Sequence, residues 1–273
     1  MEIVTLVENT PGMAGCVFEH GLSFYIETDT HKILLDTGAS EAFLQNARYL
    51  GIDLAQVDMM VLSHGHYDHA GGILEFVKVN SKAPIYMRPA AIKAYYNDRP
   101  TETKYIGMDE RIFNLERIVF TERMHVLSDQ ISLFSGVTGR RLWPEGNRQL
   151  KCLENGVYRQ DIFDHEQSLV IREKGRSILI SGCAHNGILN ILDKYQELYG
   201  EVPDMVITGF HMKKNVPLTE AEKEIVTSTA RELKSYKHTR FYSGHCTGEE
   251  AFGIMKKIMG EQLNALHSGE RIL

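Results

Sequence analysis

One ten-residue segment constrains the fold of this 273-residue chain more than any other, because four metal-binding side chains follow directly on an apolar run. The run and the segment read Met59-Met60-Val61-Leu62, then Ser63-His64-Gly65-His66-Tyr67-Asp68-His69-Ala70-Gly71-Gly72. A short apolar run followed by turn residues predicts a buried strand. Three histidines and an aspartate at the end of such a strand would be costly to bury without a ligand. The segment therefore predicts a metal centre at a strand exit.

The residue types indicate which ions this centre would hold. Imidazole and carboxylate ligands suit zinc, manganese and iron. His64 and His66, two apart in an extended segment, can point at one ion. Asp68 and His69 lie after the turn and can reach a second ion about 3.5–4 Å away. We expect one or two divalent ions, with zinc as the first choice and manganese or iron as alternatives.

Three later apolar runs also end in small residues followed by a histidine. The segments are Ser181-Gly182-Cys183-Ala184-His185, Thr208-Gly209-Phe210-His211 and Ser243-Gly244-His245-Cys246-Thr247-Gly248. One histidine at a strand end would indicate little, but three in the same context predict exits that converge on the first motif.

The pattern His-x-His-x-Asp-His after an apolar strand resembles the signature of the metallo-β-lactamase superfamily. The resemblance implies an α/β fold, the four-layer αββα sandwich, formed by residues 1–273 as a single domain. The poorly patterned region 88–160 is expected as an insertion over the active face and a source of substrate selectivity.

The resemblance also implies a set of ligands. A third histidine would complete the first ion, and a last-strand histidine, here His245, would join Asp68 and His69 on the second. His185 is the preferred third histidine and His165 the alternative, because the usual Gly-His-Thr context is absent from the chain.

Two cysteines and one aspartate lie beside these motifs. Cys183 and Asp36 each have two interpretations, and Cys246 has one. Cys183 stands where the superfamily pattern has a bridging aspartate, so it is either a thiolate ligand or a packing residue, which leaves the number of ions open. We interpret Cys246 as a packing residue. Asp36, in Asp36-Thr37-Gly38, is either a turn residue or a group that supports a ligand.

The residues after the third exit are candidates for substrate contact. His211 and Lys213 would face an anionic group such as a phosphate. The alternative is that Lys213 and Lys214 are a solvated pair.

The resemblance implies a metal-dependent hydrolase that acts on a small substrate, which includes phosphorylated compounds. Metal-bound hydroxide would be the nucleophile, and Asp68 would be a catalytic residue that orients it. The later exits resemble a branch of the superfamily that contains a pterin-condensing synthase, which makes a transferase joining a dihydropterin diphosphate to an aminobenzene ribosyl phosphate an alternative. Iron-based redox chemistry and a non-catalytic, metal-dependent sensor or binding module are further alternatives.

Composition narrows the partners. With 43% hydrophobic residues, 24% charged residues and a net charge of -6, the chain is typical of a globular protein that does not bind nucleic acid. No stretch approaches the ~20 apolar residues of a membrane span, and four cysteines without a paired spacing are typical of a reducing compartment. We expect a cytoplasmic protein with no membrane partner and leave its oligomeric state open.

The remaining patterns predict ordinary strands and helices. Glu2 to Val7 predicts a strand, and Ala70 to Val79 predicts one helix after the motif. Thr219 with Glu222 predicts a capping box, and Thr247 with Glu250 predicts a second cap before the last helix.

Overall fold

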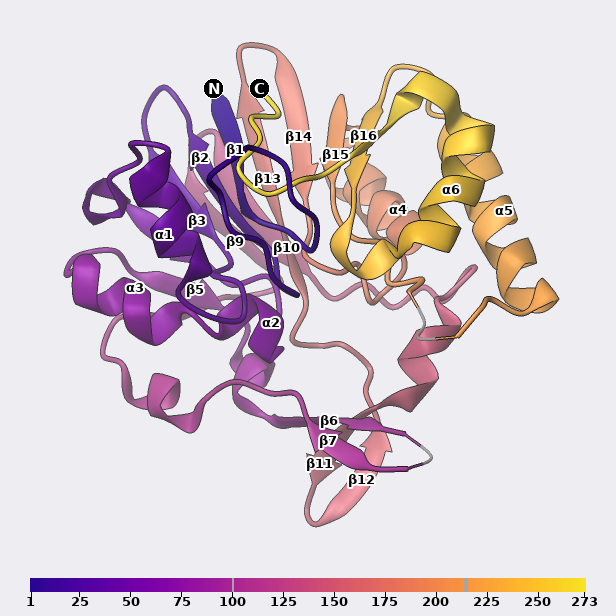
Figure 1. Cartoon of the computed structure of the whole chain (residues 1–273), viewed down its shortest axis with the longest axis horizontal. Helices are drawn as coiled ribbons and strands as arrows, with labels where there is room; N and C mark the ends of the chain where they lie inside the picture. The colour runs from indigo at the N-terminus through magenta and orange to yellow at the C-terminus, as the bar shows by residue number, and fades with distance from the viewer. Residues whose placement is uncertain (100, 214–215) are drawn as a thin grey trace.

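Two large sheets lie face to face, and helices cover the outer face of each (Figure 1). The computed structural model describes residues 1–99, 101–213 and 216–273. The predicted four-layer αββα sandwich is confirmed. Lys214 lies outside the described residues.

The first sheet contains the strand that delivers the histidine motif. Its order is β1 (Glu2–Val7), β2 (Ser23–Glu27), β3 (Lys32–Leu35), β4 (Met59–Val61), β5 (Ile85–Met87) and β8 (Ile118–Phe120). The strands from β1 to β3 pair antiparallel, and those from β3 to β8 pair parallel. Its helices are α1 (Ala42–Tyr49), α2 (Tyr67–Ala70) and α3 (Ile73–Val79).

The single helix predicted over 70–79 is wrong at its start, because α2 and α3 are separate. The break falls at Gly71 and Gly72. A Cβ on Gly72 would lie 2.6 Å from the carbonyl oxygen of Thr37, so the chain turns where it passes that backbone.

The second sheet delivers the later exits. Its order is β17 (Leu263–Ala265), β16 (Arg240–Ser243), β15 (Met205–Ile207), β14 (Arg176–Ile180), β13 (Gln167–Glu173), β10 (Ile131–Ser135) and β9 (Met124–Ser128). The strands from β14 to β17 are parallel. Helices α4 (Ile188–Tyr199), α5 (Glu220–Lys234) and α6 (Glu249–Met259) cover its outer face.

Alternating side chains on the strands build three apolar layers. Ile178 and Ile180 of β14 point into the cluster between the sheets, which also holds Ile33 and Met59 of the first sheet. Leu179, between them, points into the cluster beneath α4, α5 and α6. This period of two lets one strand bury both faces, which fixes its register.

The two predicted caps have different outcomes. Thr219 and Glu222 form the capping box of α5, as predicted. The cap at Thr247 is wrong, because Gly248 precedes α6 and makes no side-chain cap. The Thr247 hydroxyl instead accepts from the Phe210 N–H (2.9 Å) and contacts the Ser243 hydroxyl (2.7 Å), so it joins two strand exits.

A third, smaller sheet lies beyond one end of the sandwich (Figure 1). It comprises β12 (Val157–Gln160), β11 (Leu150–Glu154), β6 (Ala94–Asp98) and β7 (Thr103–Tyr105). The range 88–160 contains these strands and also β8, β9 and β10, which belong to the large sheets. Tyr95 and Phe163 pack beneath the small sheet against Tyr67 of α2, so this sheet adjoins the histidine motif.

No helix among the described residues is long and apolar enough to cross a membrane.

Candidate metal centre

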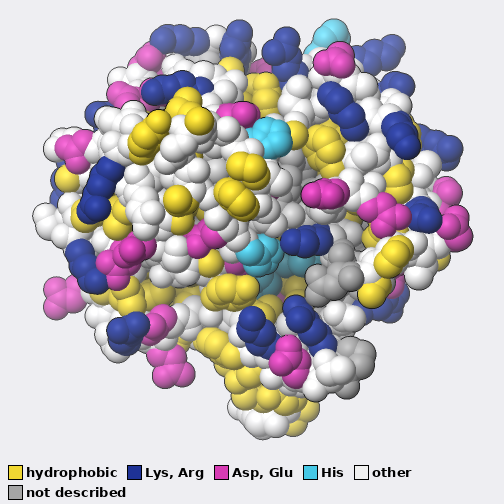
Figure 2. Space-filling view, viewed as in Figure 1, with side chains coloured by type: hydrophobic (Ala, Val, Ile, Leu, Met, Phe, Trp, Pro, Cys, Tyr) yellow, Lys and Arg dark blue, Asp and Glu magenta, His cyan; other side chains and the backbone are white. Residues whose placement is uncertain are grey.

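The histidine motif leaves β4 at the edge where β14, β15 and β16 also end. Since parallel strands present their carboxyl ends at one edge, four exits meet there. His64, His69 and His185 are almost entirely buried, and Asp68 is 8% exposed. Histidine side chains reach the surface in a hollow near the centre of Figure 2.

The first cluster joins His64, Cys183 and His185, whose ligand atoms all lie within 4.8 Å of one another. The His66 ring lies 4.6 Å from that of His64 and 4.8 Å from that of His185, measured between centroids. The Nε2 atom of His66 is buried and has no hydrogen-bond partner among the described residues. The three rings are therefore neighbours, while a ligand atom of His66 also lies within 4.8 Å of ligand atoms of Asp161 and His165.

Hydrogen bonds behind the rings fix which nitrogen of His64 and His185 carries the proton. The Ser63 hydroxyl donates to Asp36 (2.6 Å), so its oxygen accepts from Nδ1 of His64 (2.9 Å). The Asn147 amide donates to the His185 carbonyl, so its oxygen accepts from Nδ1 of His185 (3.1 Å). Both Nε2 atoms then carry lone pairs, and they face each other at 3.2 Å.

The second cluster joins His69, Cys183 and His245, again with ligand atoms within 4.8 Å. A carboxylate oxygen of Asp68 lies 3.3 Å from Nε2 of His245 and 4.0 Å from Nε2 of His69. Asp36 accepts from Nδ1 of His69 (2.7 Å), and Nδ1 of His245 lies 2.8 Å from the amide oxygen of Asn9. Here too both Nε2 atoms face inward, 3.2 Å apart.

The facing lone pairs of His64 and His185 repel unless a positive charge lies between them. A proton is disfavoured in the first cluster, because burial and the neighbouring imidazoles hold the pKa of His64 and of His185 well below the usual value. Burial and His165 likewise lower the pKa of His66 to about 3. Buried, neutral, inward-facing imidazoles beside a thiol fit one or two divalent ions of the zinc type.

The second cluster contains two carboxylates, Asp36 and Asp68, beside its histidines. Burial lowers the pKa of His69, but the charge and hydrogen bond of Asp36 outweigh it, so the pKa is raised. Burial raises the pKa of Asp68, and the hydrogen bond of His245 with the charges of His69 and His245 outweighs it, so Asp68 stays ionised. Asp68 can therefore serve as an anionic ligand or hold a water.

The structure distinguishes the two candidates for the third histidine. Nδ1 of His165 accepts from the Gly65 N–H (2.9 Å), and its Nε2 lies 3.1 Å from Asp161. Both nitrogens are occupied by protein groups, whereas Nε2 of His185 faces the centre. His165 thus holds the turn of the motif, and the choice of His185 as the third ligand stays a prediction.

Two buried glutamates behind the ligands were missed by the sequence analysis. Glu166 accepts from the N–H groups of His185 (2.6 Å) and Asn186 (2.9 Å), and Glu8 accepts from the His245 N–H (2.5 Å). Both glutamates immediately flank an apolar strand, which is the only sequence signal that could have indicated them. Their contacts join residues far apart in the chain, so pattern reasoning did not reach them.

His20 was also missed, although it adjoins the second cluster. Its Nε2 lies 3.4 Å from Asp68, and its ring stacks on that of His245 at 5.0 Å. Burial and the charge of His245 lower its pKa to about 4. Its side chain is 47% exposed, which places it at the mouth of the centre.

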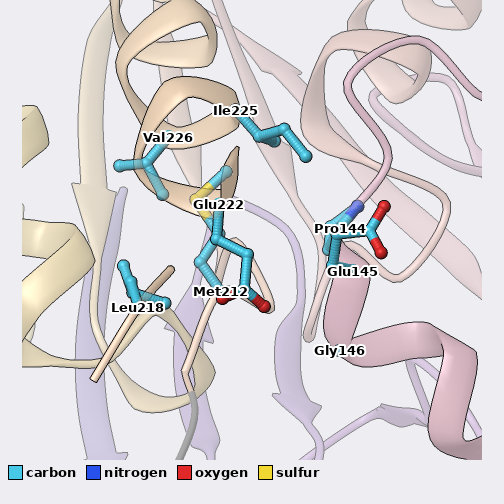
Figure 3. Close-up of a pocket in the computed structure, with 8 residues that line it drawn as sticks. All are labelled: Pro144, Glu145, Gly146, Met212, Leu218, Glu222, Ile225 and Val226. Carbon is cyan, nitrogen blue, oxygen red and sulfur yellow. The ribbon is translucent and has the colours of Figure 1, made fainter. Parts of the chain in front are cut away.

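Two hollows in the molecule differ greatly in size, and the larger one adjoins the centre. A cavity of about 900 Å³ is lined by His20, Lys213 and His245 together with the start of α6. A second hollow, between α5 and Pro144–Gly146 with Met212 within it, has only about 20 Å³ (Figure 3). Since small-molecule sites measure roughly 300–1,000 Å³, the larger cavity has the size for a substrate, and the smaller holds about one water.

Comparisons with known proteins agree with this geometry. The sequence model of the metallo-β-lactamase superfamily matches residues 17–145. Along its whole length the chain is 31% identical to the 7,8-dihydropterin-6-methyl-4-(β-D-ribofuranosyl)-aminobenzene-5'-phosphate synthase of Methanocaldococcus jannaschii, and the match covers 96% of that protein. The chain belongs to the metallo-β-lactamase superfamily.

Solved structures support the same assignment. The chain superposes on Tm1679, described as a metal-dependent hydrolase of the β-lactamase superfamily, with a TM-score of 0.82 and 32% identity, covering 100% of this chain and 98% of Tm1679. The metallo-β-lactamase fold protein YhfI of Bacillus subtilis shares the fold at a TM-score of 0.59 and 13% identity, covering 99% and 98%. The superfamily and its four-layer fold, both predicted from the motif, are confirmed.

Proposed function

We propose that this superfamily member is a metal-dependent hydrolase of small anionic substrates. The observation that carries the proposal is the double pair of inward-facing Nε2 atoms, each pair 3.2 Å apart, around the buried Cys183. His64, His66 and His185 would hold one divalent ion, and Asp68, His69 and His245 would hold a second, with Cys183 between them. An ion held there supplies Lewis acidity and lowers the pKa of a bound water.

The chain's own groups supply the rest of the chemistry. Asp68 is ionised and contacts His20, which lines the open cavity, so Asp68 can hold and orient a water. Lys213 lines the cavity and makes no ion pair with another described residue, so it can receive an anionic group of the substrate. His211 lies deeper, with its ring 4.1 Å from that of His185, which places it away from that cavity.

We also propose that residues 1–273 act as one domain and that the small sheet contributes to selectivity. Glu8 from the start of the chain holds His245 from near its end. Trp143, within the range 88–160, donates to the His185 carbonyl (2.8 Å), so the insertion borders the first cluster. Phe163 packs beneath the small sheet and stacks on the His185 ring at 4.7 Å.

A substrate panel tests the hydrolase proposal. Metal-loaded protein is assayed on phosphodiesters, lactones, thioesters and pterin diphosphates, and His66→Ala is expected to abolish turnover of any active substrate. His238→Ala, at an exposed position, is the matched control and should keep wild-type turnover. Full turnover by a metal-free His66→Ala protein would refute the mechanism.

The full-length match to a synthase favours a second candidate, a transferase that joins a dihydropterin diphosphate to an aminobenzene ribosyl phosphate. The cavity of about 900 Å³ is large enough for such a pair of reactants. Detection of the condensed product distinguishes this activity from simple hydrolysis. Tight ligand binding without turnover of either kind would instead indicate a sensor.

A further inference from the structure

Three neighbouring parallel strands each deliver one metal-binding side chain that the proposed hydrolase site does not fully use. Cys183 follows β14, His211 follows β15 and Cys246 follows β16. Their sulfur and nitrogen ligand atoms all lie within 4.8 Å of one another. Both cysteines are buried, and neither is in a disulfide.

Backbone hydrogen bonds join the three strand exits to one another. The Gly209 N–H donates to the Gly182 carbonyl (2.8 Å), and the Lys213 N–H donates to the Cys246 carbonyl (2.8 Å). A Cβ on Gly209 would lie 2.3 Å from the sulfur of Cys246. A glycine is therefore needed at this position for the sulfur to reach its place.

His211 carries two features that packing alone does not explain. Its φ of 50° lies in the left-handed region, which costs a residue other than glycine roughly 1–2 kcal/mol. Its Nδ1 is buried and has no hydrogen-bond partner among the described residues. A strained imidazole with an unpaired buried nitrogen, next to two thiols, has the properties expected of a metal ligand.

The donor set differs in chemistry from the two histidine clusters. Two thiols and one imidazole form a soft set that favours zinc, cobalt or cadmium over magnesium or manganese. We propose that Cys183, His211 and Cys246 form a third, sulfur-rich cation position beside the two histidine-bearing positions, with the Cys183 thiolate shared between them. Any proton that a thiol still carries is released to solvent when the ion binds.

The test uses the full-length protein and Co²⁺ as the probe, because cobalt bound to thiolates absorbs in the near ultraviolet in proportion to the number of Co–S bonds. Metal-free protein is titrated with Co²⁺, dialysed and analysed for bound cobalt. Cys246→Ser is expected to lose one ion per chain and part of the sulfur-to-cobalt absorbance. His211→Asn, chosen because asparagine tolerates left-handed backbone, should lose the same ion.

Cys152→Ser is the matched control, since Cys152 is buried beneath the small sheet and should leave both readings unchanged. Circular dichroism confirms that each variant is folded, and His211→Asn keeps both thiols if Cys246→Ser fails to fold. Unchanged cobalt content in both Cys246→Ser and His211→Asn would overturn the site. A loss confined to Cys246→Ser would also overturn it, because the imidazole would then not be a ligand.

Discussion

Replacing Glu166 by glutamine tests whether the buried carboxylates position the metal ligands. Glu166 is 3% exposed, and its Oε1 accepts from the His185 N–H while its Oε2 accepts from the backbone and side-chain N–H groups of Asn186. Glutamine has the same shape but only one acceptor oxygen. Keeping the two bonds to Asn186 leaves an NH₂ group facing the His185 N–H.

The magnitude follows from that one lost bond. A hydrogen bond to a charged group contributes about 1.5–3 kcal/mol, and each 1.4 kcal/mol changes an equilibrium constant about tenfold. If losing this hydrogen bond weakens the binding of the ion by His185, the dissociation constant of that ion should rise roughly 10- to 100-fold. This is the range for groups that hydrogen-bond to metal ligands. The free energy of unfolding of the metal-free protein should fall by a similar 1.5–3 kcal/mol.

Competition between the protein and a coloured chelator measures the dissociation constants. Glu8→Gln is the matched variant at the other end of the centre, because Glu8 holds the His245 N–H and its second oxygen holds Thr10. Glu166→Gln should weaken the ion of the first cluster, and Glu8→Gln the ion of the second. A double-mutant cycle with His185→Ala tests whether Glu166 acts on metal binding through His185. In the His185→Ala background, Glu166→Gln should change the dissociation constant of the first ion very little.

Two results would refute this reasoning. Wild-type affinity in Glu166→Gln would mean that the backbone of His185 needs no carboxylate. If Glu166→Gln raised the dissociation constant of the ion just as much in the His185→Ala background, Glu166 would act on the fold rather than through this ligand.

Three further results are expected. Lys213→Ala should raise KM about tenfold for an anionic substrate with little change in kcat, and an unchanged KM for every active anionic substrate would contradict its assignment. Gly209→Ala should destabilise the fold by about 1–3 kcal/mol in denaturant unfolding, through the 2.3 Å approach to a sulfur, whereas Gly253→Ala, with open space around it in α6, should not. The pKa values of His64, His66 and His185 are lowered in the folded protein, so at these three positions the unfolded chain takes up more protons as the pH falls below about 6.5. They outnumber His69, whose pKa is raised, so the metal-free protein should lose stability there. Equal stability at pH 8 and pH 5.5 would contradict this.

The sequence was sufficient for the fold and for the candidate ligands because the motifs that indicate them are local patterns. The strand at 59–61 and its histidines follow from an apolar run and its exit, and the same holds for His185 and His245. The comparisons confirm the fold that the superfamily resemblance implied. The ligand assignments stay predictions, to which the structure adds their convergence.

What the sequence could not supply are contacts between distant segments. Glu8 and His245 are 237 residues apart, and Asn147 and His185 are 38 apart. The choice between His165 and His185 depends on which ring nitrogens the protein already occupies, and no spacing reveals that. Thr247 failed as a cap because its hydroxyl is used between two strand exits.

Strain at the strand exits explains why buried carboxylates accompany the ligands. Asp36, Ala184, His211 and His245 all have φ between 48° and 57°, a conformation that costs a residue other than glycine roughly 1–2 kcal/mol. The hydrogen bonds of Glu166 at the β14 exit and of Glu8 at the β16 exit, at about 1.5–3 kcal/mol each, are large enough to offset that cost. Ala184 turns the chain so that His185 faces inward, and the N–H of His185 is the one that Glu166 holds. The same carboxylates thus stabilise the turns from which His185 and His245 face the centre.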